Sequence, residues 1–195
     1  MLKREQVWRY LADQTLDGSM AFQQQEIALE LDMSIGNVNL AIQPLRDVGA
    51  VEVVNKKLIV RDIKKLLVLW AARRTSAPVV ASFAGSGSFR ETMRVLPSRL
   101  TLTSFAGFAI RFPERPEPAP ASTIRAYVDP QDAATLSDLR SRFSEVPLGR
   151  PAMIVVHAAD ALMAAAMPSA VPPAQLYVDL WSESDFYAGD YLRAL

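Results

Sequence analysis

Residues 34–60 decide the fold of the first part of the chain: SIGNVNLAIQPLRDVGAVEVVNKKLIV. Serine is a preferred N-cap residue, so Ser34 predicts the start of a helix. The apolar residues that follow recur at spacings of three, four and three, which places them on one face; they are Ile35, Val38, Ile42 and Leu45. Gly49 comes just after the last of them and suits the C-terminal end of this helix.

The same stretch then changes to a period of two. Residues 50–54 (AVEVV) and residues 58–60 (LIV) are rich in β-branched side chains and predict two strands. Asn55, Lys56 and Lys57 separate them, a connection short enough for a tight hairpin. We therefore predict a helix followed directly by a β-hairpin.

Two more helices are predicted upstream. Residues 3–13 (KREQVWRYLAD) and residues 21–32 (AFQQQEIALELD) carry apolar side chains at helical spacing, with Ile27, Leu29 and Leu31 supplying the apolar faces of the second. A short turn is expected at Asp32–Met33. Three helices and a hairpin within residues 1–61 predict a winged helix-turn-helix domain.

Pro44 is unfavourable inside a straight third helix. Proline lacks the amide that would bond back to the carbonyl of Leu40, and it disfavours helical geometry at Gln43. The sequence leaves two alternatives open: a kinked helix, or a helix that stops near Gln43.

The remainder predicts a different architecture. Residues 62–77 are expected to form a linker helix and a domain boundary, and residues 78–195 alternate predicted strands and helices. The overall expectation is an α+β protein with an N-terminal winged helix-turn-helix and a mixed α/β C-terminal domain. The predicted strands are residues 79–83, 100–103, 124–128 and 152–156; the predicted helices are residues 88–96, 104–109, 130–143, 160–167, 175–181 and 183–195.

Composition excludes several kinds of site. The chain has no cysteine and one histidine, His157, so disulfides, thiolate metal sites and multi-histidine metal sites are excluded. No cofactor, metal or catalytic residue is predicted. The longest apolar runs are too short to span a bilayer, and a cytoplasmic protein is expected. Residues 1–74 hold 11 basic and 9 acidic side chains, which permits DNA binding without demanding it.

The candidate DNA contacts gather on the second and third predicted helices and on the hairpin. Asparagine and glutamine can pair with adenine edges in the major groove, and a helix N-terminus favours phosphate. Lysines at the hairpin turn suit phosphate or the minor groove. The predicted DNA-binding residues are Gln24, Gln25, Ser34, Asn37, Asn39, Gln43, Lys56 and Lys57.

Three other features have ordinary structural explanations. Residues 85–88 (GSGS) lack the lysine of a phosphate-binding P-loop, so a structural turn is favoured. His157 and Asp160 have no accompanying nucleophile motif, and a histidine satisfied by hydrogen bonds at a strand end is favoured. Asp179, Glu183, Asp185 and Asp190 do not converge on one helical face, which favours an acidic surface over a metal site; with them, Tyr177, Trp181 and Tyr187 form a candidate partner surface.

Two segments resemble the AbiEi family, the antitoxins and transcriptional regulators of type IV toxin–antitoxin systems. One is QQQEIALELDMSIGNVNLAIQPLRDVGAVEVV, and the more specific one is the closing VPPAQLYVDLWSESDFYAGDYLRAL. The resemblance implies a domain that binds its own promoter and a C-terminal domain that counters a nucleotidyltransferase-like toxin. It assigns base or phosphate contacts to Ser34, Asn37, Asn39 and Gln43, and hairpin contacts to Lys56 and Lys57.

The expected function is therefore a non-enzymatic, autorepressing DNA-binding regulator of antitoxin type. Its expected partners are double-stranded DNA, a nucleotidyltransferase-like toxin and a second copy in a homodimer, with no membrane association. Two alternatives remain open at this point. One is a regulator whose C-terminal domain binds a small effector, and the other is a nucleotidyltransferase-related enzyme, against which the missing carboxylate pair argues.

Overall fold

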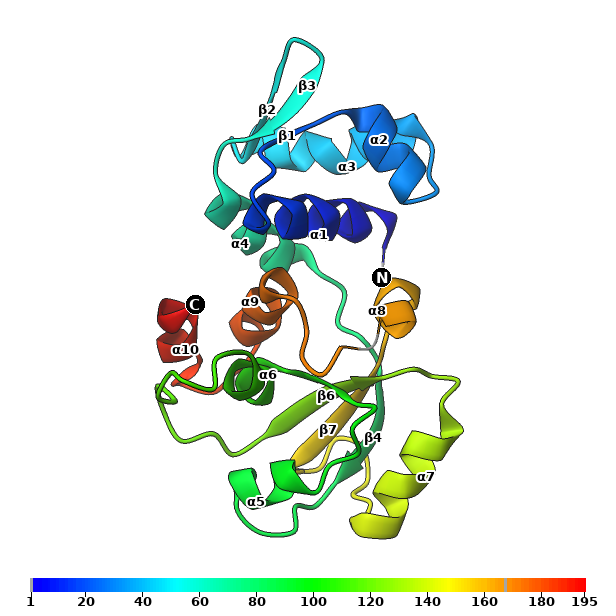
Figure 1. Ribbon diagram of the computed structural model, residues 1–195, viewed down its shortest axis with the longest axis vertical. Coiled ribbons are helices and arrows are strands. Elements are labelled where there is room, and N and C mark those ends of the chain that lie inside the picture. Colours follow the sequence, from blue (N-terminus) through cyan, green and yellow to red (C-terminus); the bar gives the residue numbers. More distant parts are fainter. Residues whose placement is uncertain (1, 167) are drawn as a thin grey trace. The chain divides into compact units, whose positions relative to one another are not determined.

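The computed structural model describes residues 2–166 and 168–195 and divides the chain into two compact units (Figure 1). The N-terminal unit comprises Met1–Thr75 together with Pro172–Val178, and the C-terminal unit comprises Ser76–Val171 and Asp179–Leu195. Both units contain helices and a sheet, so the fold is mixed α and β. Among the described helices, none is long and apolar enough to cross a membrane.

In the N-terminal unit, helices α1, α2 and α3 precede the β-hairpin and α4 follows it. Its strands form a three-stranded antiparallel sheet in the order β1-β3-β2. The elements are α1 (Lys3–Leu16), β1 (Ala21–Phe22), α2 (Gln24–Glu30), α3 (Ile35–Asp47), β2 (Val51–Val54), β3 (Lys57–Val60) and α4 (Ile63–Arg73).

Helix α3 begins directly after Ser34, as the sequence predicts, and ends at Asp47, beyond Gln43. Ser34 caps it, because the Ser34 hydroxyl oxygen accepts from the Asn37 amide at 3.2 Å. The helix continues through Pro44 to Asp47, so the alternative of a stop near Gln43 is wrong. Leu45 is fully buried just beyond the proline, and this packing holds the last turn in place.

The end of α3 and the hairpin turn both use left-handed backbone. Gly49 has a φ of 68°, as expected for the residue after a helix C-cap. Val54 pairs with Lys57, which leaves Asn55 and Lys56 as a two-residue turn, with φ values of 50° and 63°. Positive φ at both central residues matches the right-handed twist of paired strands, but only glycine adopts it without strain at Lys56.

The core of the N-terminal unit forms around α1 and α3. Trp8 is fully buried, and its indole nitrogen donates to the carbonyl oxygen of Ala41 at 2.6 Å. The buried residues of α3 are Val38, Ala41, Ile42 and Leu45. Ala174 and Val178 belong to the same core, although they lie about a hundred residues further along the chain.

The burial pattern corrects two predictions of the sequence, at Ile35 and at Leu29. Ile35 is 43% exposed, because it lies in the first turn of α3, to one side of the buried face. Leu29 is 85% exposed, because Ile27 and Ala28 form the buried face of α2. The predicted domain division also differs from the two units, since Pro172–Val178 groups with the N-terminal unit.

The C-terminal unit contains a four-stranded sheet in the order β4-β7-β6-β5, in which only β6 and β7 run parallel. In Figure 1, α5 and α7 lie on one side of this sheet and α6 and α10 on the other. The elements that follow α4 are β4 (Val79–Phe83), α5 (Phe89–Arg94), β5 (Thr101–Thr103), α6 (Ser104–Arg111), β6 (Ile124–Val128), α7 (Ala133–Arg142), β7 (Ile154–Ala158), α8 (Ala161–Ala166), α9 (Pro173–Trp181) and α10 (Ala188–Ala194).

Each predicted strand and helix of this unit has a counterpart, with boundaries that shift by a few residues. The largest shift is in the last helix, which was predicted from residue 183 and begins at Ala188. Residue 167, the predicted end of the helix before α9, lies outside the described residues.

A variant of Val178 tests whether the segment Pro172–Val178 stabilises the N-terminal unit. Val178→Ala removes two buried methyl groups and leaves a cavity, so we expect the free energy of unfolding to fall by about 2 kcal/mol. Urea unfolding followed by tryptophan fluorescence reports mainly on this unit, because Trp8 and Trp70 are buried in it, whereas Trp181 of the C-terminal unit is 42% exposed. Val54→Ala is the matched control: this valine is 36% exposed, and its loss should change stability by less than about 0.5 kcal/mol. Equal effects of the two variants would contradict the assignment of Val178 to this core.

Candidate functional site

The exposed side of α3 is set by its buried side. At about 100° per residue, the direction opposite the buried face carries four exposed residues; they are Gly36, Leu40, Gln43 and Asp47, here called the outward stripe. Asn37 and Asn39, both predicted to contact DNA, flank the outward stripe on opposite sides, about 160° apart around the helix axis. One base edge therefore cannot be contacted by both asparagines.

Ser34, Asn37 and Gln25 line a common hollow of about 550 Å³ between α2 and α3. The hydroxyl oxygen of Ser34 is occupied by the Asn37 amide, but its hydrogen remains available to an acceptor such as a phosphate oxygen. Lys3 also lines this hollow and was not among the predicted site residues. No local pattern could have indicated Lys3, because it reaches the hollow from a different helix.

Gln43 is held by its neighbour Asp47. Its side-chain nitrogen donates to the Asp47 carboxylate at 2.8 Å, one turn further along α3. An amide has two N–H donors and one carbonyl acceptor, so one donor and the acceptor remain free. This contact orients the amide group without using up the pair of atoms needed for a bidentate contact.

The predicted DNA-binding residues of the hairpin lie on the surface. Lys56 and Lys57 are exposed, and Lys56 occupies a turn position where glycine is favoured sterically. Gln24 is half-buried at the start of α2, whereas Gln25 is exposed. All eight residues predicted to contact DNA lie in the N-terminal unit.

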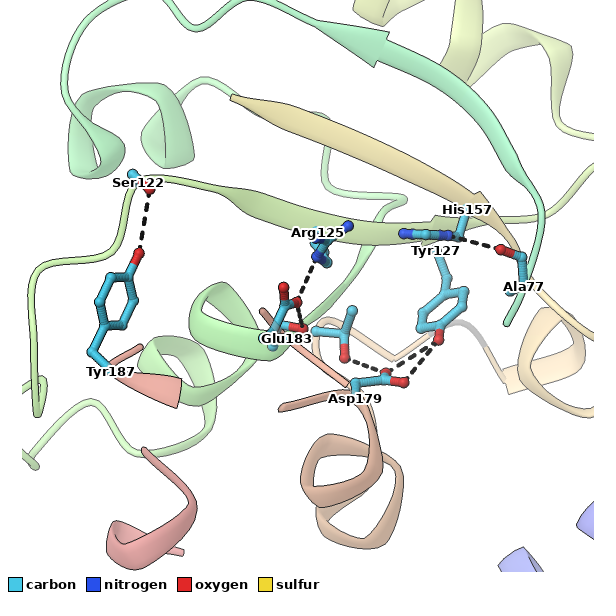
Figure 2. Close-up of polar contacts among 10 residues, drawn as sticks. Ala77, Ser122, Arg125, Tyr127, His157, Asp179, Glu183 and Tyr187 are labelled. Carbon is cyan, nitrogen blue, oxygen red and sulfur yellow. Dashed lines mark hydrogen bonds and ion pairs between the residues drawn. The ribbon is translucent and has the colours of Figure 1, made fainter. Parts of the chain in front are cut away.

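A second group of polar side chains lies inside the C-terminal unit, where Figure 2 shows it beside the sheet. Asp179 accepts from the Thr103 hydroxyl at 2.5 Å and from the Tyr127 hydroxyl at 3.1 Å. Glu183 accepts from the Ser104 hydroxyl at 2.6 Å and pairs with the guanidinium of Arg125 at 2.5 Å. We call these six residues the polar cluster.

The polar cluster corrects the prediction of an acidic surface at two of its four residues, Asp179 and Glu183. Asp179 is 5% exposed, and the side chain of Glu183 is 2% exposed. Burial of a carboxylate is costly unless it is paired, and here each has at least two partners. One oxygen of Glu183, Oε2, has no hydrogen-bond partner among the described residues.

The three aromatic residues predicted as a partner surface differ in exposure and belong to two units. Tyr177 is half-buried against the core of the N-terminal unit, whereas Trp181 and Tyr187 belong to the C-terminal unit. Tyr187 is 8% exposed and its ring packs 5.1 Å from that of Phe105. Of these three residues, Trp181 has the most exposed ring, at 42%. Binding of a partner by these residues stays a prediction.

Tyr191 lies in the aromatic core beside Tyr187, where its ring contacts those of Phe105 and Phe108. Tyr191 is fully buried and donates its hydroxyl to the carbonyl oxygen of Ala119 at 2.6 Å. Burial raises the pKa of Tyr191 to about 12. This phenol is therefore protonated at neutral pH and acts as a structural donor.

His157 has the structural role that the sequence favours. Its Nδ1 lies 3.0 Å from the carbonyl oxygen of Ala77, and its ring packs 5.8 Å from that of Tyr127 (Figure 2). Among the described residues, no group of acidic or histidine side chains is arranged to hold a metal ion.

The glycine-rich loop at residues 85–88 forms a tight turn. Ser88 caps α5, and Glu91 bonds back to it in a capping box. Hydrogen bonds from Ser88 lower the pKa of the Glu91 carboxyl. A Cβ on Gly85 would collide with the sulfur of Met153, so close packing explains this glycine.

Comparison of the chain with protein-family models, with curated proteins and with solved structures returned no match. The resemblance to the AbiEi family therefore stays a prediction from the two sequence segments that carry it.

Arg125 tests whether the polar cluster stabilises the C-terminal unit. Arg125→Met leaves the buried Glu183 carboxylate without its cation, so we expect the free energy of unfolding to fall by up to about 3 kcal/mol. The double variant Arg125→Met, Glu183→Leu removes both charges and should recover much of that loss. Urea unfolding followed by circular dichroism measures both. If Arg125→Met alone is as stable as the parent protein, the ion pair is not a structural element.

Proposed function

We propose that the N-terminal unit is a winged helix-turn-helix domain that binds double-stranded DNA, and that the protein is a transcriptional regulator. In this proposal α3 is the recognition helix, α2 precedes it, and the β2–β3 hairpin is the wing. The observation that carries the proposal is the outward stripe of α3, which is exposed along the whole helix beside a capped N-terminus.

The electrostatics of this unit favour a specific interaction over a purely ionic one. Lys3, Lys56 and Lys57 offer cations to phosphates, but Glu26 and Glu30 on α2 are also exposed. A face of mixed charge gives weak non-specific binding, because that binding depends on released counterions. Contacts to base edges must then supply much of the affinity.

The resemblance to AbiEi proteins extends this proposal. It supports a repressor of its own promoter that also acts as an antitoxin, with the C-terminal unit as the part that counters a nucleotidyltransferase-like toxin. The C-terminal unit offers Trp181 as an exposed aromatic anchor for such a protein.

Gly36 provides a variant that separates DNA binding from folding. A Cβ at Gly36 would meet only the Ser34 hydroxyl, at 3.8 Å, so a side chain fits there. Gly36→Glu should stabilise the helix slightly, because glycine is a poor helix former and an anion near the N-terminus is favourable. The same carboxylate would face the phosphates, and we expect affinity for the DNA upstream of the gene to fall more than tenfold in a fluorescence-anisotropy titration.

Two comparisons make the Gly36 result interpretable. Gly36→Gln adds a side chain of the same length without charge, which separates steric from electrostatic effects. Ala72→Glu adds the same charge to an exposed position of α4 and should leave affinity within about twofold. An unchanged affinity for Gly36→Glu would show that α3 does not enter the groove.

A variant of Lys56 also separates an effect on DNA binding from an effect on stability. Lys56→Gly relieves the left-handed backbone and should raise the free energy of unfolding by about 1 kcal/mol. It also removes one phosphate contact, so the slope of log affinity against log salt should become shallower by about 0.9. Lys64→Ala, which removes a charge from an exposed position of α4, is the control. A more stable Lys56→Gly protein with an unchanged salt slope would exclude Lys56 as a phosphate contact.

A further inference from the structure

Large aliphatic side chains are exposed on the two helices proposed to meet DNA. Leu29 on α2 is 85% exposed, and Leu40 and Ile35 on α3 are 75% and 43% exposed. Single exposed leucines are ordinary on protein surfaces. Leu40 is different in its position, because it lies in the middle of the outward stripe, between Gly36 and Gln43.

The segment of α3 that contains Leu40 carries no cationic side chain. From Ser34 to Leu45 the sequence contains no lysine or arginine, and Arg46 lies in the last turn. Guanine is contacted in the major groove mainly by arginine and lysine. The first turns of α3 therefore lack the side chains that recognise G·C pairs, and they offer amides and aliphatic groups instead.

Amide and aliphatic side chains suit the two bases of an A·T pair. An amide side chain pairs with N6 and N7 of adenine, and the only apolar group on a base edge in the major groove is the 5-methyl of thymine. We propose that α3 recognises A·T base pairs, with Leu40 packed against a thymine methyl and Gln43 paired with an adenine. This inference rests on the proposed DNA-binding function and specifies its sequence preference.

The spacing of Leu40 and Gln43 agrees with contacts to neighbouring base pairs. Three residues of helix advance by about 4.5 Å, and base pairs are stacked about 3.4 Å apart. Asp47 holds the Gln43 amide at 2.8 Å, so the amide is oriented before DNA arrives. Less side-chain freedom is then lost on binding, which favours the specific complex.

A duplex library with a randomised core tests the inference, because no operator needs to be known. Selection with the full-length protein should enrich sites with A·T pairs at their centre. Selected duplexes are then synthesised with each thymine replaced in turn by deoxyuridine, which removes only the methyl group. At the thymine under Leu40 we expect affinity to fall about fourfold, the factor that corresponds to burying one methyl group.

Leu40→Ala identifies the side chain responsible. It should bind the thymine duplex as weakly as the parent protein binds the uracil duplex, and it should no longer distinguish the two. Because Leu40 is exposed, the variant should fold normally. Leu29→Ala removes another exposed leucine, from α2, and should keep the full preference for thymine.

Several results would overturn the inference while leaving DNA binding intact. These are a selected site without A·T pairs, equal affinity for thymine and uracil at every position, or an equal loss on both duplexes in Leu40→Ala. If Leu40→Ala leaves DNA binding unchanged, Leu40 does not contact DNA. Its exposed side chain would then suit a protein partner. Failure of the parent protein to enrich any sequence would instead contradict the proposed DNA-binding function itself.

Discussion

The packing of α3 against α1 is the constraint on which the candidate site depends. The buried Trp8 indole donates to the carbonyl oxygen of Ala41, and Val38, Ile42 and Leu45 fill the space around it. These contacts fix the rotation of α3 about its own axis. Once that rotation is fixed, Gly36, Leu40 and Gln43 must face outward, and the chemistry of the exposed side follows.

The sequence predicted the elements of this unit well, because the signals are local. The Ser34 cap and the left-handed Gly49 are properties of a few neighbouring residues, as is the Asn55–Lys56 turn. Periodicity also identified the buried side of α3. It failed at Ile35, because a spacing of three residues from Val38 does not reveal that Ile35 lies to one side of the buried face.

The parts that could not be predicted depend on residues far apart in the sequence. Val178 packs into a core built mainly from the first 75 residues, and no local pattern indicates this. Asp179 and Thr103 are separated by 76 positions, so the spacing of the acidic residues could not show that they are buried. The same holds for Lys3, which reaches the hollow between α2 and α3 from another helix.

The two units therefore use polar side chains in opposite ways. In the C-terminal unit, carboxylates and hydroxyls satisfy one another inside the fold, which makes the polar cluster a structural feature. In the N-terminal unit, amides and lysines are left exposed on a rigid helix and on a strained turn. A rigid element that presents unsatisfied donors and acceptors is suited to recognise an external surface with matching groups.

The central claim is that the outward stripe of α3 lies in the major groove. The chain has no cysteine, so Leu40→Cys introduces a unique thiol on that stripe. Disulfide cross-linking to a thiol tethered at N6 of adenine, which projects into the major groove, measures the contact directly. The account predicts a cross-link with Leu40→Cys and none with Ala72→Cys on α4; a cross-link of Ala72→Cys alone, or equal yields from both, would contradict it.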